Sequence, residues 1–183
     1  MDVGRGCGSR DGCFVYERIA IMLWCYLITQ QIQRNITSVI LQRQTKPMPK
    51  DQYTVRAAKS DDLAVLPVIE QAAAAQFRTT NYAALADFEL ASTAIDLEHE
   101  NVWVVVNGDD QPVGFAIVHV DESSVVHLHE IDVHPQHARQ GLGRWLIDAV
   151  AKWAQEQGAK ALTLTTFGDV PWNGPYYERL GFR

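Results

Sequence analysis

The sequence predicts an α+β domain in which helices pack on one mixed β-sheet. Apolar runs of strand length follow one another between residues 102 and 133, and the turn signal Asn107-Gly-Asp-Asp110 separates the first two. A strongly amphipathic helix and another short apolar strand come next. An apolar helix stripe must be buried against another element, so this pattern predicts helices covering a sheet.

The first third of the domain contributes one strand and two predicted helices. Residues Tyr53–Ala57 alternate as a strand does. Ser60 is a candidate N-cap, and the acids Asp61 and Asp62 complement the dipole of a helix predicted to reach about Ala75. A second helix is predicted over Tyr82–Ala94.

The remaining elements are clearer. Three successive strands are predicted over Val102–Val106, Val113–Val120 and Val125–Val133. The following helix is expected to end near Gly158. It has one continuous apolar stripe, formed by Leu142, Trp145, Leu146, Ala149, Val150 and Trp153. A strand over Ala161–Thr166 and a short helix over about Asn173–Leu180, closed by Gly181, complete the order β-α-α-β-β-β-α-β-α.

Charge and cysteine content narrow the function. Residues 51–183 contain nine Lys and Arg against nineteen Asp and Glu, which argues against nucleic-acid binding and favours a cationic acceptor such as an amine. The three cysteines are Cys7, Cys13 and Cys25. The domain therefore has no disulfide, thiolate nucleophile or Cys-based zinc site, which fits a reducing compartment and predicts a cytoplasmic protein.

Residues 1–47 form a separate extension, bounded by Pro47-Met-Pro49, and the domain spans residues 51–183. The apolar run Ile19–Thr29 would span about 16 Å as a helix, short of the roughly 30 Å hydrocarbon core. Three interpretations remain: an artefactual or poorly ordered extension, which is favoured, a peripheral helix, and a membrane-associated anchor.

The segment Val133-His-Pro-Gln-His-Ala-Arg-Gln-Gly-Leu-Gly-Arg144 is the most informative motif. It opens the amphipathic helix, and free N–H groups at a helix N-terminus bind phosphates. A Rossmann site does not fit, because antiparallel strands precede a long loop instead of a tight glycine turn. A P-loop does not fit either, because no Gly-Lys-Ser/Thr follows.

Together with Tyr177-Glu-Arg-Leu-Gly-Phe182, this motif resembles the GNAT family of acyl-CoA-dependent N-acetyltransferases over about residues 53–183. The resemblance implies a GNAT fold, acetyl-CoA as co-substrate, and Tyr177 as the general acid for the CoA sulfur. It implies pantetheine hydrogen bonds at Ile131 and Val133, with Asn173 either capping the last helix or contacting the pantetheine. It also implies a pyrophosphate loop made of Arg139, Gln140, Gly141, Leu142, Gly143 and Arg144.

Two features depart from the family's pattern. Ala138 stands where the family usually has Gln or Arg, and we expect a small cost because backbone N–H groups make most phosphate contacts. The chain ends at Arg183, where the family's fold continues with two strands. We therefore expect truncated C-terminal strands, a bare sheet edge and an open acceptor site.

Amine acetylation needs a base, because an alkylammonium with a pKa of about 10.4 is not nucleophilic. Glu130 is the preferred base, since partial burial raises a carboxyl pKa; His127, His129 and Asp132 on the same strand are alternatives. A metal at His127-Leu-His-Glu130 is rejected, because neighbouring strand positions converge poorly. Trp172 and Asp169 are candidate acceptor contacts.

The sequence thus predicts acetyl transfer from acetyl-CoA to a primary amine of a small molecule or peptide, by direct attack in a ternary complex. The alternative is a GNAT-like module that binds acyl-CoA without catalysis. No metal and no nucleic-acid partner are expected, and the sequence leaves a homodimer open.

Overall fold

A computed structural model describes residues 36–37, 52–87, 90–94, 100–167, 170 and 172–183. Contacts divide the chain into residues 1–34 and 35–183, and all the described residues belong to the second unit. The interpretations of residues 1–35 and 38–47 therefore lie outside the described residues. Within the described part, no helix has the length and apolarity needed to cross a membrane.

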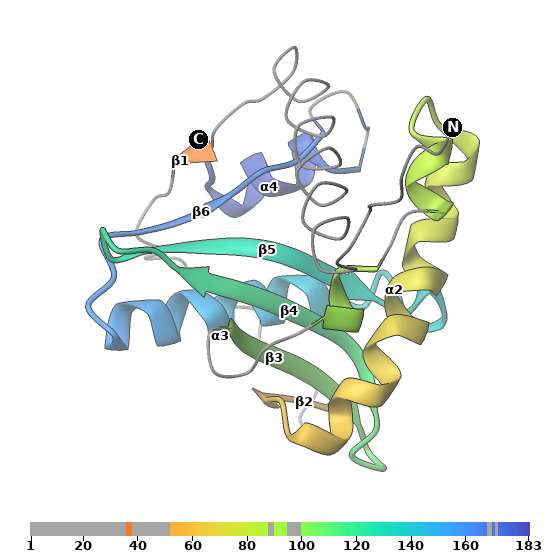
Figure 1. Ribbon diagram of the computed structural model, residues 1–183, viewed down its shortest axis with the longest axis horizontal. Coiled ribbons are helices and arrows are strands. Elements are labelled where there is room, and N and C mark those ends of the chain that lie inside the picture. Colours follow the sequence, from red (N-terminus) through yellow and green to blue (C-terminus); the bar gives the residue numbers. More distant parts are fainter. Residues whose placement is uncertain (1–35, 38–51, 88–89, 95–99, 168–169, 171) are drawn as a thin grey trace, which may run out of the picture. The chain divides into compact units, whose positions relative to one another are not determined.

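One six-stranded sheet in the order β1-β6-β5-β4-β3-β2 forms the centre of the domain (Figure 1). All neighbours are antiparallel except β5 and β6, which run parallel. The mixed sheet predicted from the sequence is confirmed. The strands are β1 (Ile36–Thr37), β2 (Tyr53–Ala57), β3 (Glu100–Asn107), β4 (Pro112–Val120), β5 (Val125–Val133) and β6 (Ala161–Leu164).

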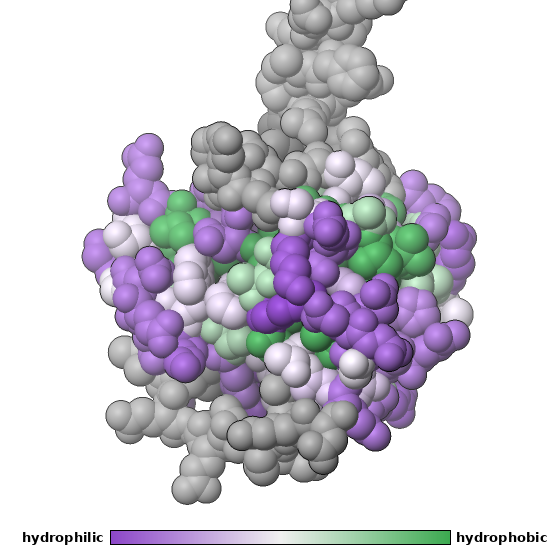
Figure 2. Space-filling model, turned by 90° about the horizontal axis from the view of Figure 1, so that it is seen from below, coloured by the Kyte–Doolittle hydropathy of each residue, from purple (hydrophilic) through white to green (hydrophobic). Residues whose placement is uncertain are grey.

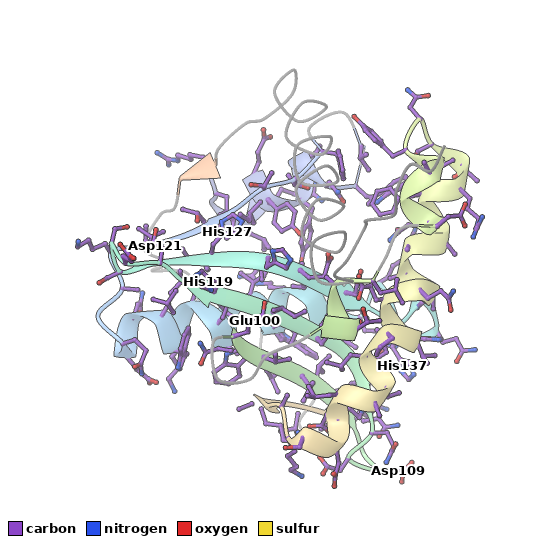
Figure 3. All side chains as sticks on the ribbon, in the orientation of Figure 1. Glu100, Asp109, His119, Asp121, His127 and His137 are labelled. Carbon is purple, nitrogen blue, oxygen red and sulfur yellow. The ribbon has the colours of Figure 1, made fainter. Side chains whose placement is uncertain are left out.

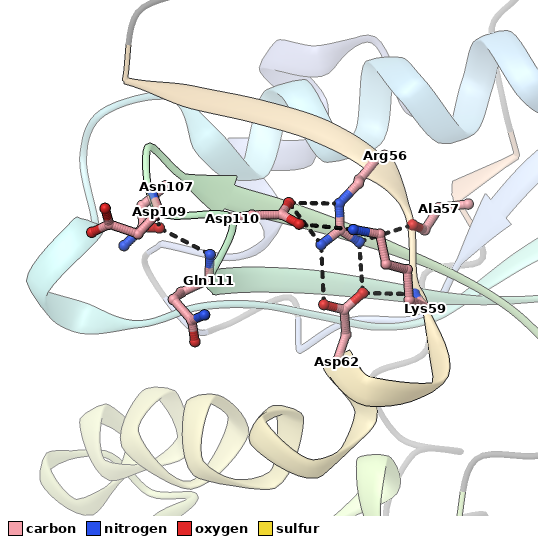
Figure 4. Close-up of polar contacts among 8 residues, drawn as sticks. All are labelled: Arg56, Ala57, Lys59, Asp62, Asn107, Asp109, Asp110 and Gln111. Atoms are coloured by element: carbon pink, nitrogen blue, oxygen red, sulfur yellow. Dashed lines mark hydrogen bonds and ion pairs between the residues drawn. The ribbon is translucent and has the colours of Figure 1, made fainter.

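The first predicted helix consists of three consecutive pieces: η1 (Ser60–Val65), α2 (Leu66–Ala74) and η2 (Ala75–Thr79). Ser60 is not its cap. The carboxylate of Asp62 accepts the Lys59 N–H at 2.6 Å, and it also accepts Arg56 Nη1 at 2.6 Å. Figure 4 shows Asp110 completing this network against Arg56 and Lys59. The ion pairs, which tie β2 to η1 and to the β3–β4 turn, decide where the helix begins.

The single helix predicted over Tyr82–Ala94 is wrong. The described residues there form two short 3₁₀ helices, η3 (Ala83–Asp87) and η4 (Ala91–Ala94). The buried carboxylate of Glu70 on α2 accepts the N–H groups of Ala91 at 2.7 Å and Ser92 at 2.8 Å, as well as the Ser92 hydroxyl. These bonds to another element satisfy the first N–H groups of η4, which have no partner within a short helix.

Two glycines end the helices after β5 as the sequence predicts. The amphipathic helix is α3 (Leu142–Glu156), and Gly158 follows it with φ of +71°. The last helix is α4 (Gly174–Leu180), whose C-cap Gly181 has φ of +98°. Left-handed backbone at a helix end strongly favours glycine, because a Cβ clashes with the carbonyl oxygen there.

Each face of the sheet is covered by different elements. The larger core lies on the α3 face, where Leu146 and Val150 of α3 meet Val118 and Val126, and the end of α4 contributes Leu180. On the other face α2 packs with Leu66 and Ile69 against a set of buried side chains from β3 and β4, namely Val102, Val104, Val106, Phe115 and Ile117. Seen from below, hydrophilic residues cover much of the described surface between hydrophobic patches (Figure 2).

The outer edge of β6 is partly covered. Ile36 pairs with Leu164 and Thr37 with Thr163, so β1 lies antiparallel to β6. From the sequence, this edge was expected to be bare. A short strand that precedes the domain in the sequence instead supplies a ladder there, which satisfies part of the backbone that a free edge leaves unpaired.

A β-bulge in β5 determines which side chains reach the α2 face. Leu128 pairs with Val118 and Glu130 with Ile117, so His129 is the extra residue between them. Leu128 lies on the α3 face with Val118. Without the bulge Glu130 would share that face, because strand side chains alternate with a period of two. The bulge instead places Glu130 with Ile117, on the α2 face.

Candidate active site

Three carboxylates gather on the α2 face at the C-terminal end of β5. Glu130 and Asp132 share this face because their cross-strand partners Ile117 and Phe115 belong to the α2 core. Glu70 reaches the same place from α2, and its negative charge raises the pKa values of both. The structure thus joins an acidic pair on one strand to a third acid that lies some sixty residues earlier in the chain.

The electrostatics of this group suit a general base. Burial and, to a smaller extent, the charge of Glu70 raise the pKa of Glu130 to about 7, against a hydrogen bond from the Ile131 N–H that lowers it. Burial also raises the pKa of Asp132 well above its ordinary value, with the charges of Glu130 and Glu70 acting in the same direction. A carboxyl group that titrates near neutrality is well matched to proton transfer at physiological pH.

Glu70 is not among the site residues predicted from the sequence. The residue lies on the buried stripe of α2 with Leu66, Ile69 and Ala73, and it is only 8% exposed. An acid on an otherwise apolar helix face is the signal that could have identified it, because a charged residue is almost never fully buried unless it has partners. Its partners are Ala91 and Ser92 of η4.

Tyr177 on α4 lies within electrostatic range of the carboxylates. Burial raises the pKa of Tyr177 strongly, and the neighbouring Tyr176, Glu130 and Asp132 raise it further. The phenol therefore keeps its proton across the physiological range and is available as a proton donor. Its ring packs edge-on against Phe182, with 5.9 Å between centroids.

The loop between β5 and α3 presents free peptide N–H groups. Among the described residues, no acceptor is found for the backbone N–H groups of residues 139–144, and the first helical bond runs from the Trp145 N–H to the Gly141 oxygen at 3.1 Å. Arg139 and Gly141 have φ of +62° and +88°. Left-handed residues next to a helix N-terminus form concave sites for anions, so this loop fits a pyrophosphate.

A hydrogen bond anchors this loop to the sheet. The hydroxyl of Tyr53 on β2 lies 2.9 Å from Nδ1 of His137, and the two rings meet edge to face at 5.9 Å. His137 belongs to η5 (Pro135–His137), which begins the loop. Neither residue was singled out in the sequence, because the two are 84 positions apart.

In the described part of the chain, no strand pairs with the outer edge of β5 at its C-terminal end. Pairing with β6 covers only Val125 to Leu128, and β6 ends at Leu164. The N–H of Ile131 is bonded to the Glu130 carboxylate at 3.2 Å and takes no part in the β4 ladder. Alternate residues share an edge, so Ile131 and Val133 both present backbone groups on the side that β6 has left. These are the two residues expected to bind a pantetheine.

The histidines of β5 are placed apart from the loop. His127 faces His119 across the β4–β5 ladder, and its Nδ1 lies 3.0 Å from the Thr163 hydroxyl. Burial and the charges of His129 and His119 lower its pKa. Figure 3 shows His119 and His127 toward the end of the sheet near Asp121, with His137 on the other side. His129, the bulge residue, is exposed.

The remaining residues that were predicted to bind the cofactor or the acceptor differ in what they offer to a ligand. Arg144 points along α3 to Asp148, with 3.5 Å between Nε and Oδ2. Leu142 is buried in the core, so only its backbone is available to a ligand. Asn173 occupies the N-cap position of α4, but its side chain makes no capping bond. Gln140 is exposed, and Gly143 lies close to the Tyr176 hydroxyl. Asp169 lies outside the described residues.

In the described residues, the pairing of β6 with β5 ends at Leu128, and the unbonded N–H groups of residues 139–144 follow at the N-terminus of α3. The chain belongs to the acetyltransferase (GNAT) family, whose model matches residues 66–182. This confirms the family that the paired motifs predicted.

Solved structures agree at the level of the fold. The ribosomal-protein-S18-alanine N-acetyltransferase from Escherichia coli superposes with a TM-score of 0.59 at 24% identity, covering 72% of this chain and 77% of that chain. The PaiA N-acetyltransferase from Thermoplasma acidophilum, solved in complex with coenzyme A, superposes with a TM-score of 0.61 at 12% identity, covering 72% of this chain and 89% of that chain. A GNAT-family acetyltransferase from Staphylococcus aureus Mu50 superposes with a TM-score of 0.55 at 16% identity, covering 72% of this chain and 84% of that chain.

Proposed function

We propose that this protein transfers an acetyl group from acetyl-CoA to a primary amine by direct attack in a ternary complex. The observation that carries the proposal is the carboxylate of Glu130, whose pKa is about 7, at the open edge of β5 and within electrostatic range of the Tyr177 hydroxyl. A base and an acid are thereby available to the same reaction.

Glu130 and Tyr177 carry out the proton transfers in the proposed reaction. Glu130 accepts a proton from the acceptor's ammonium, and the freed amine nitrogen attacks the thioester carbonyl carbon. The carbon–sulfur bond breaks as Tyr177 gives its proton to the departing thiolate. The attacking nitrogen, positively charged once its bond to carbon has formed, passes its second proton to the Tyr177 phenolate, and Glu130 releases its proton to water. The net products are therefore the amide, the free thiol and one proton. The domain has no cysteine to carry the acetyl group covalently.

The described residues fit an acyl-CoA. The unbonded N–H groups of residues 139–144, with the cation of Arg139, suit its pyrophosphate. The backbone edge at Ile131 and Val133 suits an extended amide-containing chain, which would add to the sheet as a strand does. When bound, the thioester supplies the activated acetyl group.

Thiol release from acetyl-CoA across a panel of primary amines tests the proposal. We expect release that depends on the amine, with a Gly141→Glu variant losing CoA binding because its side chain would be strained at φ of +88° and would bring negative charge to the phosphate site. Binding of CoA without thiol release on any amine would favour the non-catalytic module instead. Undiminished CoA binding by Gly141→Glu would remove the loop from the site.

The Tyr53–His137 bond gives a separate prediction about the loop. We expect a Tyr53→Phe variant to raise the KM for acetyl-CoA by roughly 2- to 10-fold, the value of one hydrogen bond, and to leave kcat nearly unchanged. Steady-state kinetics measure both constants. In a His137→Ala background the same substitution should have no further effect, because the partner is already gone. A fall in kcat with constant KM would contradict a positioning role.

A further inference from the structure

Four aromatic side chains form a cluster that no step of the proposed reaction uses. Phe77 lies 6.3 Å from Phe167 and 6.1 Å from Trp172, and Tyr82 lies 4.4 Å from Phe167, measured between ring centroids. None of the four belongs to either buried core of the sheet. Trp172 is 39% exposed, one of only three large hydrophobic side chains in the described residues that remain so open to solvent. This aromatic cluster is therefore partly buried and reaches the surface at Trp172.

The aromatic cluster is built from the two segments that also carry the reactive groups. Phe77 follows Glu70 by seven residues along the continuous α2–η2 helix, which is about two turns and the same side of the helix. Trp172 precedes Tyr177 by five residues at the start of α4. Each segment thus runs from the aromatic rings into the carboxylate–tyrosine site.

Charge and aromatic surface together describe one kind of ligand. Glu70, Glu130 and Asp132 favour a cation, whereas nearby Arg78 is paired with Asp87 at 2.8 Å and presents no competing anion site. Partly exposed rings bind apolar groups and also attract a cation over their faces. A chain of several charges and little apolar surface, such as a polyamine, would leave the rings uncovered.

We propose that the aromatic cluster binds the apolar part of the acceptor, so that the acceptor is a primary amine carried within a few bonds of an aromatic or bulky aliphatic group. The inference rests on the proposed function and narrows its substrate class. Two sources share this chemistry: a small arylalkylamine, and the N-terminal residue of a peptide with an apolar side chain.

The test compares matched acceptors on the full-length protein: phenethylamine with ethylamine, and the peptide Phe-Ala-Ala with Gly-Ala-Ala. We expect kcat/KM to favour the apolar member of at least one pair by about tenfold, and the pair that shows it identifies the source. Trp172→Ala should abolish most of the preference and leave the KM for acetyl-CoA unchanged, while Trp172→Phe should keep much of it. Val68→Ala, at an exposed apolar position on α2, serves as the control.

Two outcomes would overturn the inference. One is transfer to both members of each pair with equal kcat/KM, which leaves the acetyltransferase proposal standing. The other is a preference that Trp172→Ala does not change. If no amine supports thiol release, the proposed function fails separately. Calorimetric binding of phenethylamine and ethylamine to the CoA-loaded protein then decides: tighter phenethylamine binding that Trp172→Ala removes supports the aromatic cluster, and equal binding overturns it.

Discussion

A Glu130→Gln variant is expected to lose kcat by roughly 10²- to 10⁴-fold, the usual contribution of a general base, while its KM for acetyl-CoA stays near the wild-type value. Glutamine keeps the shape of the side chain but cannot accept a proton from the ammonium. Burial makes the carboxylate of Glu130 costly, so the amide should fold at least as stably above pH 7. Circular dichroism melting checks the fold, and stopped-time thiol assays measure kcat.

The pH dependence identifies the same group independently. Glu130 acts as a base only when deprotonated and its pKa is about 7, so wild-type kcat should fall about tenfold per pH unit below pH 7 and level off above it. The acid limb should disappear in Glu130→Gln. The exposed Glu122, in the β4–β5 turn, supplies a matched control, and Glu122→Gln should keep the wild-type profile. An unchanged acid limb in Glu130→Gln would transfer the role to Asp132 or His127.

A Tyr177→Phe variant is expected to lower kcat by roughly 10²-fold or more, because the leaving thiolate no longer receives a proton from a positioned donor. The phenyl ring retains the edge-on contact with Phe182, so the core around α4 should be preserved. Burial and the nearby acids raise the pKa of Tyr177, which means that the phenol does not titrate in the assay range and should add no alkaline limb of its own.

The adjacent tyrosine provides the control for this experiment. Burial raises the pKa of Tyr176 to about 12, and its hydroxyl lies against Gly143 at the start of α3, away from the carboxylates that shift Tyr177. We expect Tyr176→Phe to keep a kcat close to wild type. A Tyr177→Phe variant with an unchanged kcat, or an equal loss in both variants, would show that the hydroxyl of Tyr177 is not the proton donor.

Local sequence patterns were sufficient to predict most of the strands and the loop between β5 and α3. Strand alternation predicted β5 at its observed bounds, and the apolar stripe with a glycine near Gly158 predicted α3 and its end. These signals are short-range, since side-chain period and glycine backbone freedom act within a few residues. The prediction of one helix over Tyr82–Ala94 was wrong because the structure there depends on a distant residue. The backbone of η4 is bonded to Glu70, which lies on another element.

Some features of the candidate site follow from the sequence, and others follow only from the tertiary structure. Glu130 and Tyr177 were selected by residue type and motif, and the family membership that the motifs implied is shown by the match over residues 66–182. The bulge at His129, which turns Glu130 to the α2 face, leaves no local mark in the sequence. The Tyr53–His137 bond and the position of Glu70 beside Glu130 could not be inferred, because both depend on which distant segments meet.

The sequence by itself determined the order of the strands and α-helices from β3 to α4, the glycine at the N-terminus of α3 and the identity of the acid and base candidates, because each depends on neighbouring residues. The tertiary structure alone decided that three carboxylates share one side of β5, that the pKa of Glu130 lies near 7, and that four aromatic rings from separate segments meet in one cluster. A pKa is set by burial and by charges brought near in space, and neither follows from distance along the chain.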